Sequence, residues 1–571
     1  MKTIGYILMV FLVCVCYLYS IRKLMTKRGI VIAIICGIMW TFTSLIGFLT
    51  ESNQLHFLKT FVGTIQALFF LLIHTIIFGT ISLYLFIKLD GSSKEMIIDH
   101  KIIFLNQRNF YKTVGTIALC WLPYCIMHFP ARLGGGSTNQ IAQFYGQETF
   151  ARKLSPIIYE NHFITNHHPV LLTYLYGMFF KVGNIMGNTN AFAFLLSCII
   201  LLINSFCMAY LLKTVKKYIS IKLYAAVLLI ICFHPIFGTY SYTICKDNLF
   251  ASALIIFYAL ILELSLKDDK DSICNKHFKR KLLAVSILIP FLKNQGFLIV
   301  IISLVFIAKK IEKIRRFAIM GIGIIIFTYI ILFSKILMPA LKIAPGGKQE
   351  MLSVPFQQTA LYVQKYRDEL EQKEYEIIDA VLPVDIIAEI YVADKADAVK
   401  FKYKQDATRK ELLNYFLLWI KLFFKHPDVY FKAFFALTDG YYYIGYGKAE
   451  LDLYMDVGYG ASTPQWVLNF EEKEMALWQF LIHMPIIGVF FRVAIFTWIT
   501  FFSFFYCIYR KEKKCLLVFT PIILNFVVCI LGPWNGIIRY ALPIIYALPV
   551  TVCLLGKKEV NDKSIEVNHG I

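Results

Sequence analysis

The stretch KDNLFASALIIFYALILELSL, residues 246–266, decides the fold class of this chain. A helix needs about 20 consecutive, mostly apolar residues to cross the hydrocarbon core of a bilayer, and residues 248–266 meet that requirement. Similar segments recur along the chain, in which 58% of the 571 residues are hydrophobic and only 17% are charged. The sequence therefore predicts an all-α polytopic membrane protein and excludes a cytosolic enzyme or a disordered chain.

The basic residues predict how the chain threads the bilayer. The formal net charge is +21, and the excess lies in short loops between apolar segments, as is typical of cytoplasmic loops. This distribution argues against a nucleic-acid partner. We expect a multi-pass protein of the cytoplasmic membrane with about 13 transmembrane helices, the N-terminus outside and the C-terminus inside. The expected helices lie near 4–21, 29–50, 61–88, 113–128, 190–212, 223–243 and 248–266, twice within 281–308, and near 317–338, 486–508, 515–532 and 539–556.

Five parts follow from this threading. They are three N-terminal helices with a basic cytoplasmic loop (1–112), a membrane core (113–338) with an outer loop (129–189), a mainly helical extracytoplasmic domain (339–485), C-terminal helices (486–556) and a cytoplasmic tail (557–571). The apolar segment 169–187 is expected to lie along the outer surface, because a further span would move the basic loop after residue 212 outside. Lys293-Asn294-Gln295-Gly296 interrupts 281–308, and broken backbone at membrane depth is typical of a protein-lined cavity.

Polar residues in apolar surroundings gather at the predicted outer boundary, where each is costly unless it faces water or a partner. They are Arg132, Gln140, Gln143, Glu148, His162, His167, His168, Lys246, Asp247, Lys293, Asn294, Trp534, Asn535 and Arg539. We expect a water-facing site there, covered by the domain 339–485.

Several of these residues have two interpretations. His167 and His168 either start a helix or supply a general base or metal ligand, and Lys246-Asp247 either starts a helix or places a carboxylate beside a cation. Lys293 and Arg539 either bind phosphate or extend to the interface. The run Gly134-Gly135-Gly136-Ser137 favours a flexible turn over a phosphate cradle, because no GK[ST] follows it. The 14 cysteines form no CxxC pair and are expected to be structural.

Six short motifs follow one another in a recognisable order. They are Gln140-Ile141-Ala142-Gln143-Phe144, Asn166-His167-His168-Pro169-Val170, Lys246-Asp247, Lys293-Asn294-Gln295-Gly296, Pro355-Phe356-Gln357-Gln358-Thr359-Ala360, and Gly532-Pro533 with Arg539-Tyr540-Ala541-Leu542-Pro543. This order resembles a family of bacterial polytopic membrane proteins of unknown function that is similar to the GT-C glycosyltransferases, including the protein mannosyltransferase and aminoarabinose transferase branches. The resemblance covers roughly residues 113–556.

The resemblance implies a GT-C-like fold and transfer of a sugar from a polyprenyl-phosphate donor to an envelope glycan, lipid or protein acceptor on the outer face of the membrane. Membrane lipids are further expected partners, and a divalent metal ion is a possible cofactor. Asp247 matches the second acidic position of such enzymes. The candidate catalytic residues are Asp247, His167, His168 and Glu148. The candidate substrate-binding residues are Gln140, Gln143, Lys246, Lys293, Asn294, Gln357, Gln358, Arg539 and Tyr540.

The first acidic position of these enzymes is missing, since no carboxylate lies between Pro130 and Gln147. Either Glu148, Glu160 or Asp247 replaces it, or His167 or His168 acts as the base, or the chain has lost catalysis. Two other function classes therefore stay open. One is a non-catalytic envelope-assembly protein with a GT-C-like fold, and the other is a lipid-linked sugar flippase or transporter.

Overall fold

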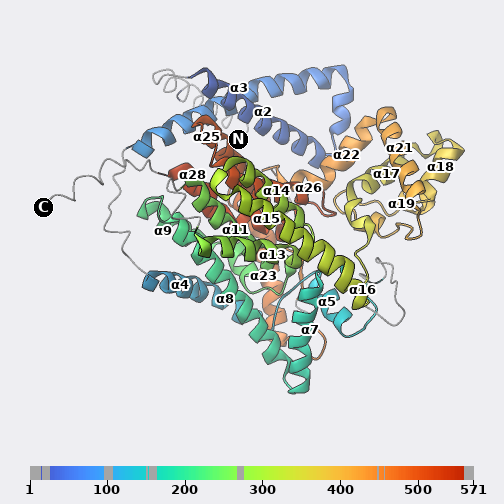
Figure 1. Ribbon diagram of the computed structural model, residues 1–571. Helices are drawn as coiled ribbons and strands as arrows, with labels where there is room; N and C mark the ends of the chain where they lie inside the picture. Colours follow the sequence, from blue (N-terminus) through green and yellow to red (C-terminus); the bar gives the residue numbers. More distant parts are fainter. Residues whose placement is uncertain are drawn as a thin grey trace.

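The computed structural model is mostly helical (Figure 1). It describes residues 15, 26–94, 107–149, 152, 164–266, 275–445, 449, 451–454 and 457–557. The predicted helix 4–21 apart from residue 15, His162, Glu160 and most of the predicted tail lie outside the described residues.

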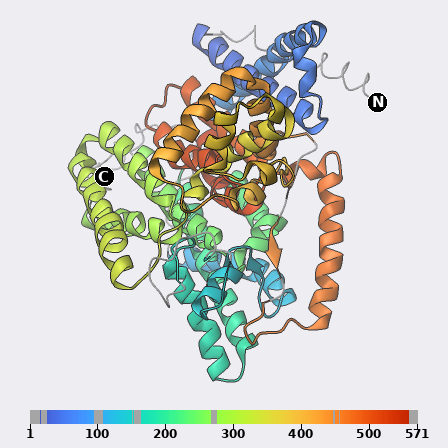
Figure 2. The same ribbon diagram turned by 90° about the vertical axis from the view of Figure 1, so that its right-hand side faces the viewer.

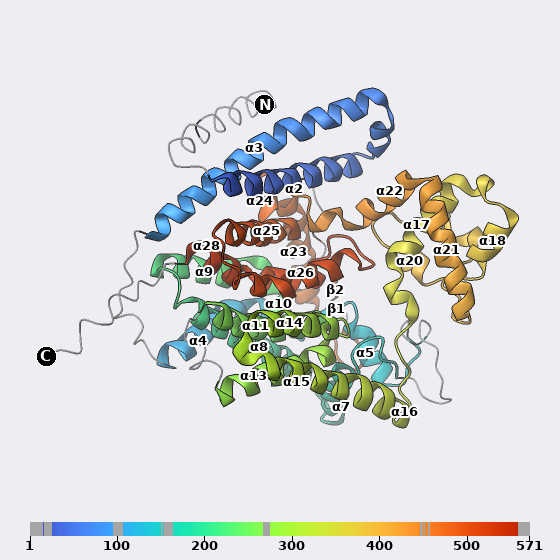
Figure 3. The same cartoon turned by 45° about the horizontal axis from the view of Figure 1, so that its top comes forward.

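The N-terminal part is a helical hairpin. Helix α2 (Lys27–Glu51) and helix α3 (Phe61–Lys94) run side by side and are joined by the short 3-10 helix η1 (Leu55–Lys59), as Figure 3 shows. α2 also packs against α22 (Pro427–Thr438) and α25 (Val493–Tyr509). Many apolar side chains of the hairpin are exposed, as expected for helices that face lipid.

Helix α11 (Lys246–Leu266) is the centre of the core. It is hydrophobic on every side, and such a helix is stable only when it is surrounded. Its neighbours are α8 (Thr189–Val215), α13 (Lys276–Leu292), α26 (Leu516–Ile530) and α27 (Ile538–Tyr546). The first turn of α11, which carries Lys246 and Asp247, therefore lies where several helices meet.

Two of the predicted apolar segments are broken. Helix α9 (Ile221–Phe233) and helix α10 (Pro235–Ser241) meet at a 57° bend, because Pro235 cannot donate a backbone hydrogen bond and so ends the first helix. α13 ends at Leu292 and α14 (Gly296–Lys310) begins four residues later. The predicted interruption at Lys293-Asn294-Gln295-Gly296 is thus confirmed.

The described residues contain six helices that are long and apolar enough to cross a membrane, or seven with the bent pair α9 and α10. The shorter apolar helices α7 (Val170–Ile185), α25 and α26 come in addition. The chain is a multi-pass membrane protein. The count falls below 13 partly because the break leaves α13 and α14 with 17 and 15 residues. The count of 13, the surface position of 169–187 and the orientation stay predictions.

Residues 353–438 form a lobe at one end of the helical core, to the right in Figures 1 and 3. Its helices are α17 (Ser353–Tyr366), α18 (Gln372–Asp379), α19 (Val384–Ile387), α20 (Asp397–Lys400), α21 (Arg409–Lys425) and α22. The lobe has a hydrophobic core of its own around Phe356, Tyr415 and Tyr430. Helix α23 (Gln465–His483) is not part of it and runs separately in Figure 2, in orange.

The remaining elements are α4 (Gln107–Met127), which packs against α8, and segments that are short or connect these parts. These segments are β1 (Leu133–Gly134), α5 (Ser137–Phe144), η3 (Glu312–Ile314), α15 (Arg315–Ile325), the π-helix η4 (Ile326–Leu337), α16 (Met338–Ala340), η5 (Lys348–Met351), η6 (Arg367–Glu369), η7 (Asp439–Tyr441), β2 (Leu453–Tyr454), α24 (Ile487–Phe490) and α28 (Leu548–Gly556). The two strands pair antiparallel, with Leu133 opposite Tyr454 and Gly134 opposite Leu453.

Candidate functional site

Asp247 is a completely buried carboxylate held between two cations. It lies in the first turn of α11, where the helix dipole favours a negative charge. The Nζ of Lys293 donates a hydrogen bond to its Oδ1 at 2.6 Å, and an Nη atom of Arg539 lies 3.6 Å from its Oδ2. Lys293 comes from the break between α13 and α14, and Arg539 from the start of α27. Charges buried in this way require partners, and the three groups satisfy one another.

Asp452 is a second buried carboxylate, which the sequence analysis missed. Its Oδ2 lies 2.7 Å from Arg539, and its Oδ1 accepts a hydrogen bond of 2.9 Å from the hydroxyl of Tyr454. The pairing of β1 with β2 brings it against the glycine run, where a Cβ on Gly135 would lie only 2.5 Å from Asp452 Oδ2. The loop that lacks an acidic residue of its own thus receives one from a distant part of the chain.

The two predicted histidines lie beside this carboxylate pair. His168 Nδ1 accepts a hydrogen bond of 2.7 Å from the ammonium of Lys246, and the His167 and His168 rings meet edge to face at 4.5 Å. Burial lowers the pKa of His167 to about 4 and that of His168 well below its usual value. Both rings are therefore neutral at pH 7, and each can accept a proton or a hydrogen bond.

The segment before the lobe and the lobe itself complete the polar cluster. Glu350 on η5 lies 3.8 Å from His167 Nδ1, and Lys400 on α20 lies 3.0 Å from Glu350 and 2.8 Å from Asp397. Burial alone would raise the pKa of the Glu350 carboxyl, but the charge of Lys400 brings that pKa below its usual value. Neither Glu350 nor Lys400 was predicted as a site residue.

Tyr540 forms an aromatic wall next to the cations. The Arg539 guanidinium lies 4.8 Å and the Lys293 ammonium 5.1 Å from the centre of its ring, and Phe250 lies 5.3 Å from Lys293 on another side. An aromatic face attracts a cation and excludes water from it. Lys293 and Arg539 are thus held by both carboxylates and rings.

Other predicted site residues support the site or lie elsewhere. Gln140 donates to the carbonyl of Pro169, Gln143 donates to Thr165, and Asn294 donates to the carbonyl of Asn166 and accepts from Tyr329. These contacts position the histidine loop and the helix break. Gln357 and Gln358 form hydrogen bonds inside the lobe, to the carbonyls of Val392 and Tyr430, and Glu148 is exposed beyond the end of α5.

Arg132 belongs to a second ion cluster. It is completely buried, lies 2.7 Å from Glu474 and 3.5 Å from Glu471 of α23, and shares Glu474 with His128. Burial would raise the pKa of Glu474, but the hydrogen bond from His128 and the charge of Arg132 lower it to about 2. This cluster fixes α23 to the loop after α4, so Arg132 has a structural role.

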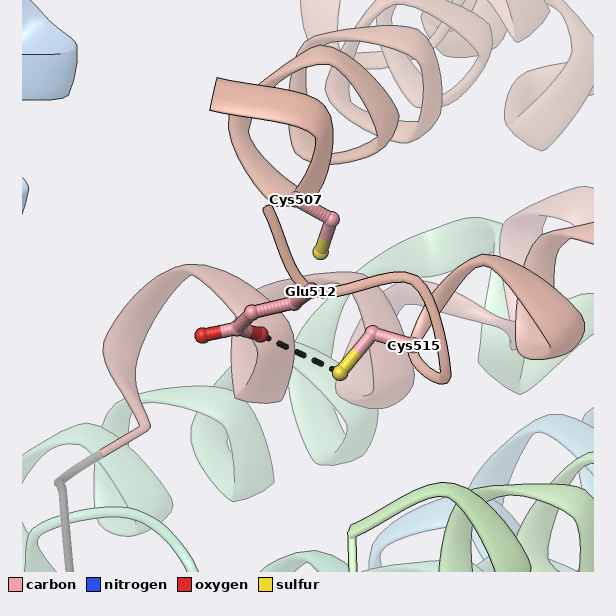
Figure 4. Close-up of side chains that lie close together, drawn as sticks. All are labelled: Cys507, Glu512 and Cys515. Carbon is pink, nitrogen blue, oxygen red and sulfur yellow. Dashed lines mark hydrogen bonds between the residues drawn. The ribbon is translucent and has the colours of Figure 1, made fainter. Parts of the chain in front are cut away.

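The candidate site does not fit a divalent metal ion. Its two central carboxylates already share the guanidinium of Arg539, which lies where a bridging cation would bind. In the described part of the chain one group could hold a metal, namely Cys507, Glu512 and Cys515 (Figure 4). Cys507 is near the end of α25, and Glu512 and Cys515 lie between α25 and α26. Lys557, which follows α28, contacts Glu512 at 2.5 Å, whereas Arg539 of the candidate site lies at the start of α27. That ammonium already neutralises the acidic ligand.

Comparison with known proteins identifies a family but no activity. Residues 151–568 match the model of a protein family that is described as a family of unknown function. No curated protein and no solved structure matches the chain. The matched segment contains His167, Asp247, Lys293, Asp452 and Arg539, but not the glycine run at 134–136.

Proposed function

The chain belongs to the DUF6020 family, whose function is unknown, and we propose that it is a membrane glycosyltransferase that uses a polyprenyl-phosphate sugar donor. The supporting observation is the buried set of Asp247, Asp452, Lys293 and Arg539 at the start of α11, next to the Lys246–His168 pair. The proposal includes a GT-C-like fold, about 13 transmembrane helices, a site on the outer face, and an envelope glycan, lipid or protein as acceptor.

The reaction requires cations at the leaving group. The acceptor oxygen forms a bond to the anomeric carbon while the bond from that carbon to the phosphate oxygen breaks, so negative charge develops on the lipid phosphate. Fixed cations stabilise such a charge most strongly in a site without water. Of the three cations, Lys246 is the best placed to bind the phosphate. It contacts a neutral imidazole and forms no ion pair in the part of the chain that the structure describes. Lys293 and Arg539 join it when they turn from Asp247 toward the phosphate.

The reaction also requires a base that takes the proton of the acceptor hydroxyl. Asp247 and Asp452 are carboxylates whose cation partners would be drawn to the phosphate, which would free their oxygen atoms to accept that proton. His167 and His168 are alternatives because both are neutral at pH 7, but the lowered pKa makes each a weaker base than an exposed histidine. We favour Asp452 for the role of the missing loop carboxylate, because it lies against Gly135 and contacts Arg539.

One observation favours a different function. Lys293 and Arg539 are each already paired with a carboxylate, as in a structural ion network. This pairing would suit a non-catalytic envelope-assembly protein that keeps the fold without the chemistry. The flippase alternative has no such support.

The test compares cell-envelope glycans after deletion of the gene. Strains that carry the parent protein, Asp247→Asn, Asp452→Asn or the control Asp385→Asn are analysed by mass spectrometry, with equal membrane amounts verified. Asp385 is a lobe carboxylate whose side chain is 67% exposed. We expect one sugar to disappear on deletion and to return with the parent and Asp385→Asn only. Full restoration by Asp247→Asn would contradict catalysis and favour the assembly role.

A further inference from the structure

Helix α21 of the lobe is apolar on two opposite faces. Tyr415, Leu418 and Leu422 point into the lobe core and are 1%, 6% and 1% exposed. A second set of side chains, spaced four, three and four residues apart, follows the opposite face. This apolar stripe consists of Leu413, Leu417, Ile420 and Phe424, which are 60%, 60%, 47% and 76% exposed. An exposed apolar stripe of this kind is typical of a surface that binds a partner or a membrane.

Aromatic contacts connect the apolar stripe to the lipid-facing surface of α2. Phe424 contacts Phe423 at 5.3 Å between ring centres, Phe423 contacts Phe431 at 5.9 Å, and Phe431 stacks on Phe435 at 5.9 Å. Phe435 then meets Phe42 of α2 edge to face at 6.5 Å. Because α2 is one of the candidate membrane spans and Phe42 is itself exposed, the stripe extends a surface that already faces acyl chains.

Polar contacts place α22, which follows α21, at the level where the hairpin turns. Lys59 forms an ion pair of 2.8 Å with Asp428, and Lys432 donates a hydrogen bond of 2.7 Å to Asn53. Asn53 and Lys59 lie between α2 and α3, where two spans end. The last helix of the lobe therefore lies at the membrane boundary, and Figure 3 shows α21 running across the direction of the α2–α3 hairpin.

The charges at the start of α21 agree with this position. Arg409 and Lys410 lie in its first turn and are exposed, next to Glu411, whose carboxylate accepts hydrogen bonds from the N-cap residue Thr408. Basic residues beside an apolar face are typical of helices that lie in the membrane interface, because phosphate head groups attract them while the apolar side chains enter the acyl region.

We propose that α21 is an interfacial membrane helix. Its apolar stripe inserts among the acyl chains of the bilayer that the chain spans, while its opposite face packs into the lobe. The bilayer and α2 together hold the lobe at the membrane surface. This inference concerns the lipid bilayer as the partner and does not depend on the proposed enzymatic activity.

Photo-crosslinking tests the proposal in the full chain. The photoreactive residue p-benzoylphenylalanine replaces Leu417 or Ile420 of the stripe, and each protein is reconstituted into phosphatidylethanolamine and phosphatidylglycerol vesicles, irradiated and analysed for lipid adducts by mass spectrometry. Phe42 serves as the lipid-facing positive control. Asn414, which is exposed on the side of the same helix, is the matched negative control.

We expect adducts at Leu417 and Ile420 in amounts similar to those at Phe42, and about five-fold less at Asn414, because only the stripe reaches the acyl chains. Adducts at Phe42 without adducts at either stripe position would overturn the proposal. So would crosslinks from the stripe to a second copy of the chain in place of lipid, since the stripe would then be a protein interface. Because two stripe positions are tested, the experiment still decides the question if the substitution at one of them prevents folding.

Discussion

Lys293→Met should destabilise the protein by about 3–5 kcal/mol, although methionine is the more apolar residue. The Lys293 and Asp247 side chains are 7% and 0% exposed, and their charged atoms are 2.6 Å apart. At an effective dielectric constant near 20, unit charges at that distance attract each other by about 6 kcal/mol. Removal of the lysine leaves Asp247 with the longer ion-pair contact to Arg539, at 3.6 Å, and a weak hydrogen bond from the Cys245 thiol at 3.8 Å.

A double-mutant cycle separates this pair from simple packing. Asp247→Leu alone should also cost about 3–5 kcal/mol, because it leaves a buried ammonium unpaired. The double variant Lys293→Met/Asp247→Leu removes both charges, and Arg539 keeps its contact to Asp452. We expect it to lie within about 2 kcal/mol of the parent, which makes the coupling energy about 4 kcal/mol or more.

Cysteine reactivity provides the assay. Nine of the eleven free cysteines in the described residues are buried, so a thiol-reactive dye reports unfolding as detergent micelles are titrated with sodium dodecyl sulfate. The reasoning is refuted if Lys293→Met costs less than about 1 kcal/mol, or if the double variant loses the sum of the two single losses. Either result would mean that the two charges do not stabilise each other in the folded protein.

Three further predictions concern other contacts. Gly135→Ala places a methyl group 2.5 Å from Asp452. We therefore expect a deletion strain that carries this variant to regain at least about tenfold less of the envelope sugar than one that carries the parent protein, with equal amounts of both proteins in the membrane. Full restoration would argue against a role for this carboxylate. Burial lowers the pKa of His167 to about 4 from a usual 6.5. As the pH falls, the ring therefore takes up a proton in the unfolded chain before it does so in the folded protein, and the free energy of unfolding falls by up to about 3 kcal/mol between pH 6.5 and 4. His167→Gln should reduce that fall in dye-monitored unfolding, and an identical pH profile would contradict the assignment. Glu474→Gln leaves the buried Arg132 without its nearest anion and should cost about 3 kcal/mol in the same assay; a loss below about 1 kcal/mol would show that this pair does not hold α23.

The membrane helices could be predicted from sequence because the bilayer sets one length for all of them. Residues 248–266 were expected as a helix and form most of α11, and each predicted segment from 29–50 onward coincides with one helix or with two or three consecutive helices. The break at Lys293 was predictable as well, since a charged residue inside an apolar run requires a polar partner. That partner is Asp247, which was predicted separately.

The rest of the site depends on contacts between distant segments. Asp452 reaches the site through a two-residue strand pairing with Leu133 and Gly134, and no local pattern marks such a short strand. Lys400 lies in a four-residue helix of the lobe and contacts Glu350. Both are ordinary surface-type residues in sequence, so only the packing of the lobe and of β2 reveals them.

The contact between His167 and Glu350 separates the charges of the membrane core from those of the lobe. His167 connects the membrane core to Glu350 and the lobe, and its ring lies 3.8 Å from the Glu350 carboxylate. The ion pairs on either side are shorter, at 2.6 Å for Asp247 with Lys293 and 3.0 Å for Glu350 with Lys400. Each ion pair is formed by residues on one side of this contact. Substitutions that remove the charges of Glu350 and Lys400 together would therefore leave the ion pair of Asp247 with Lys293 in place, so the two ion pairs can be exchanged independently.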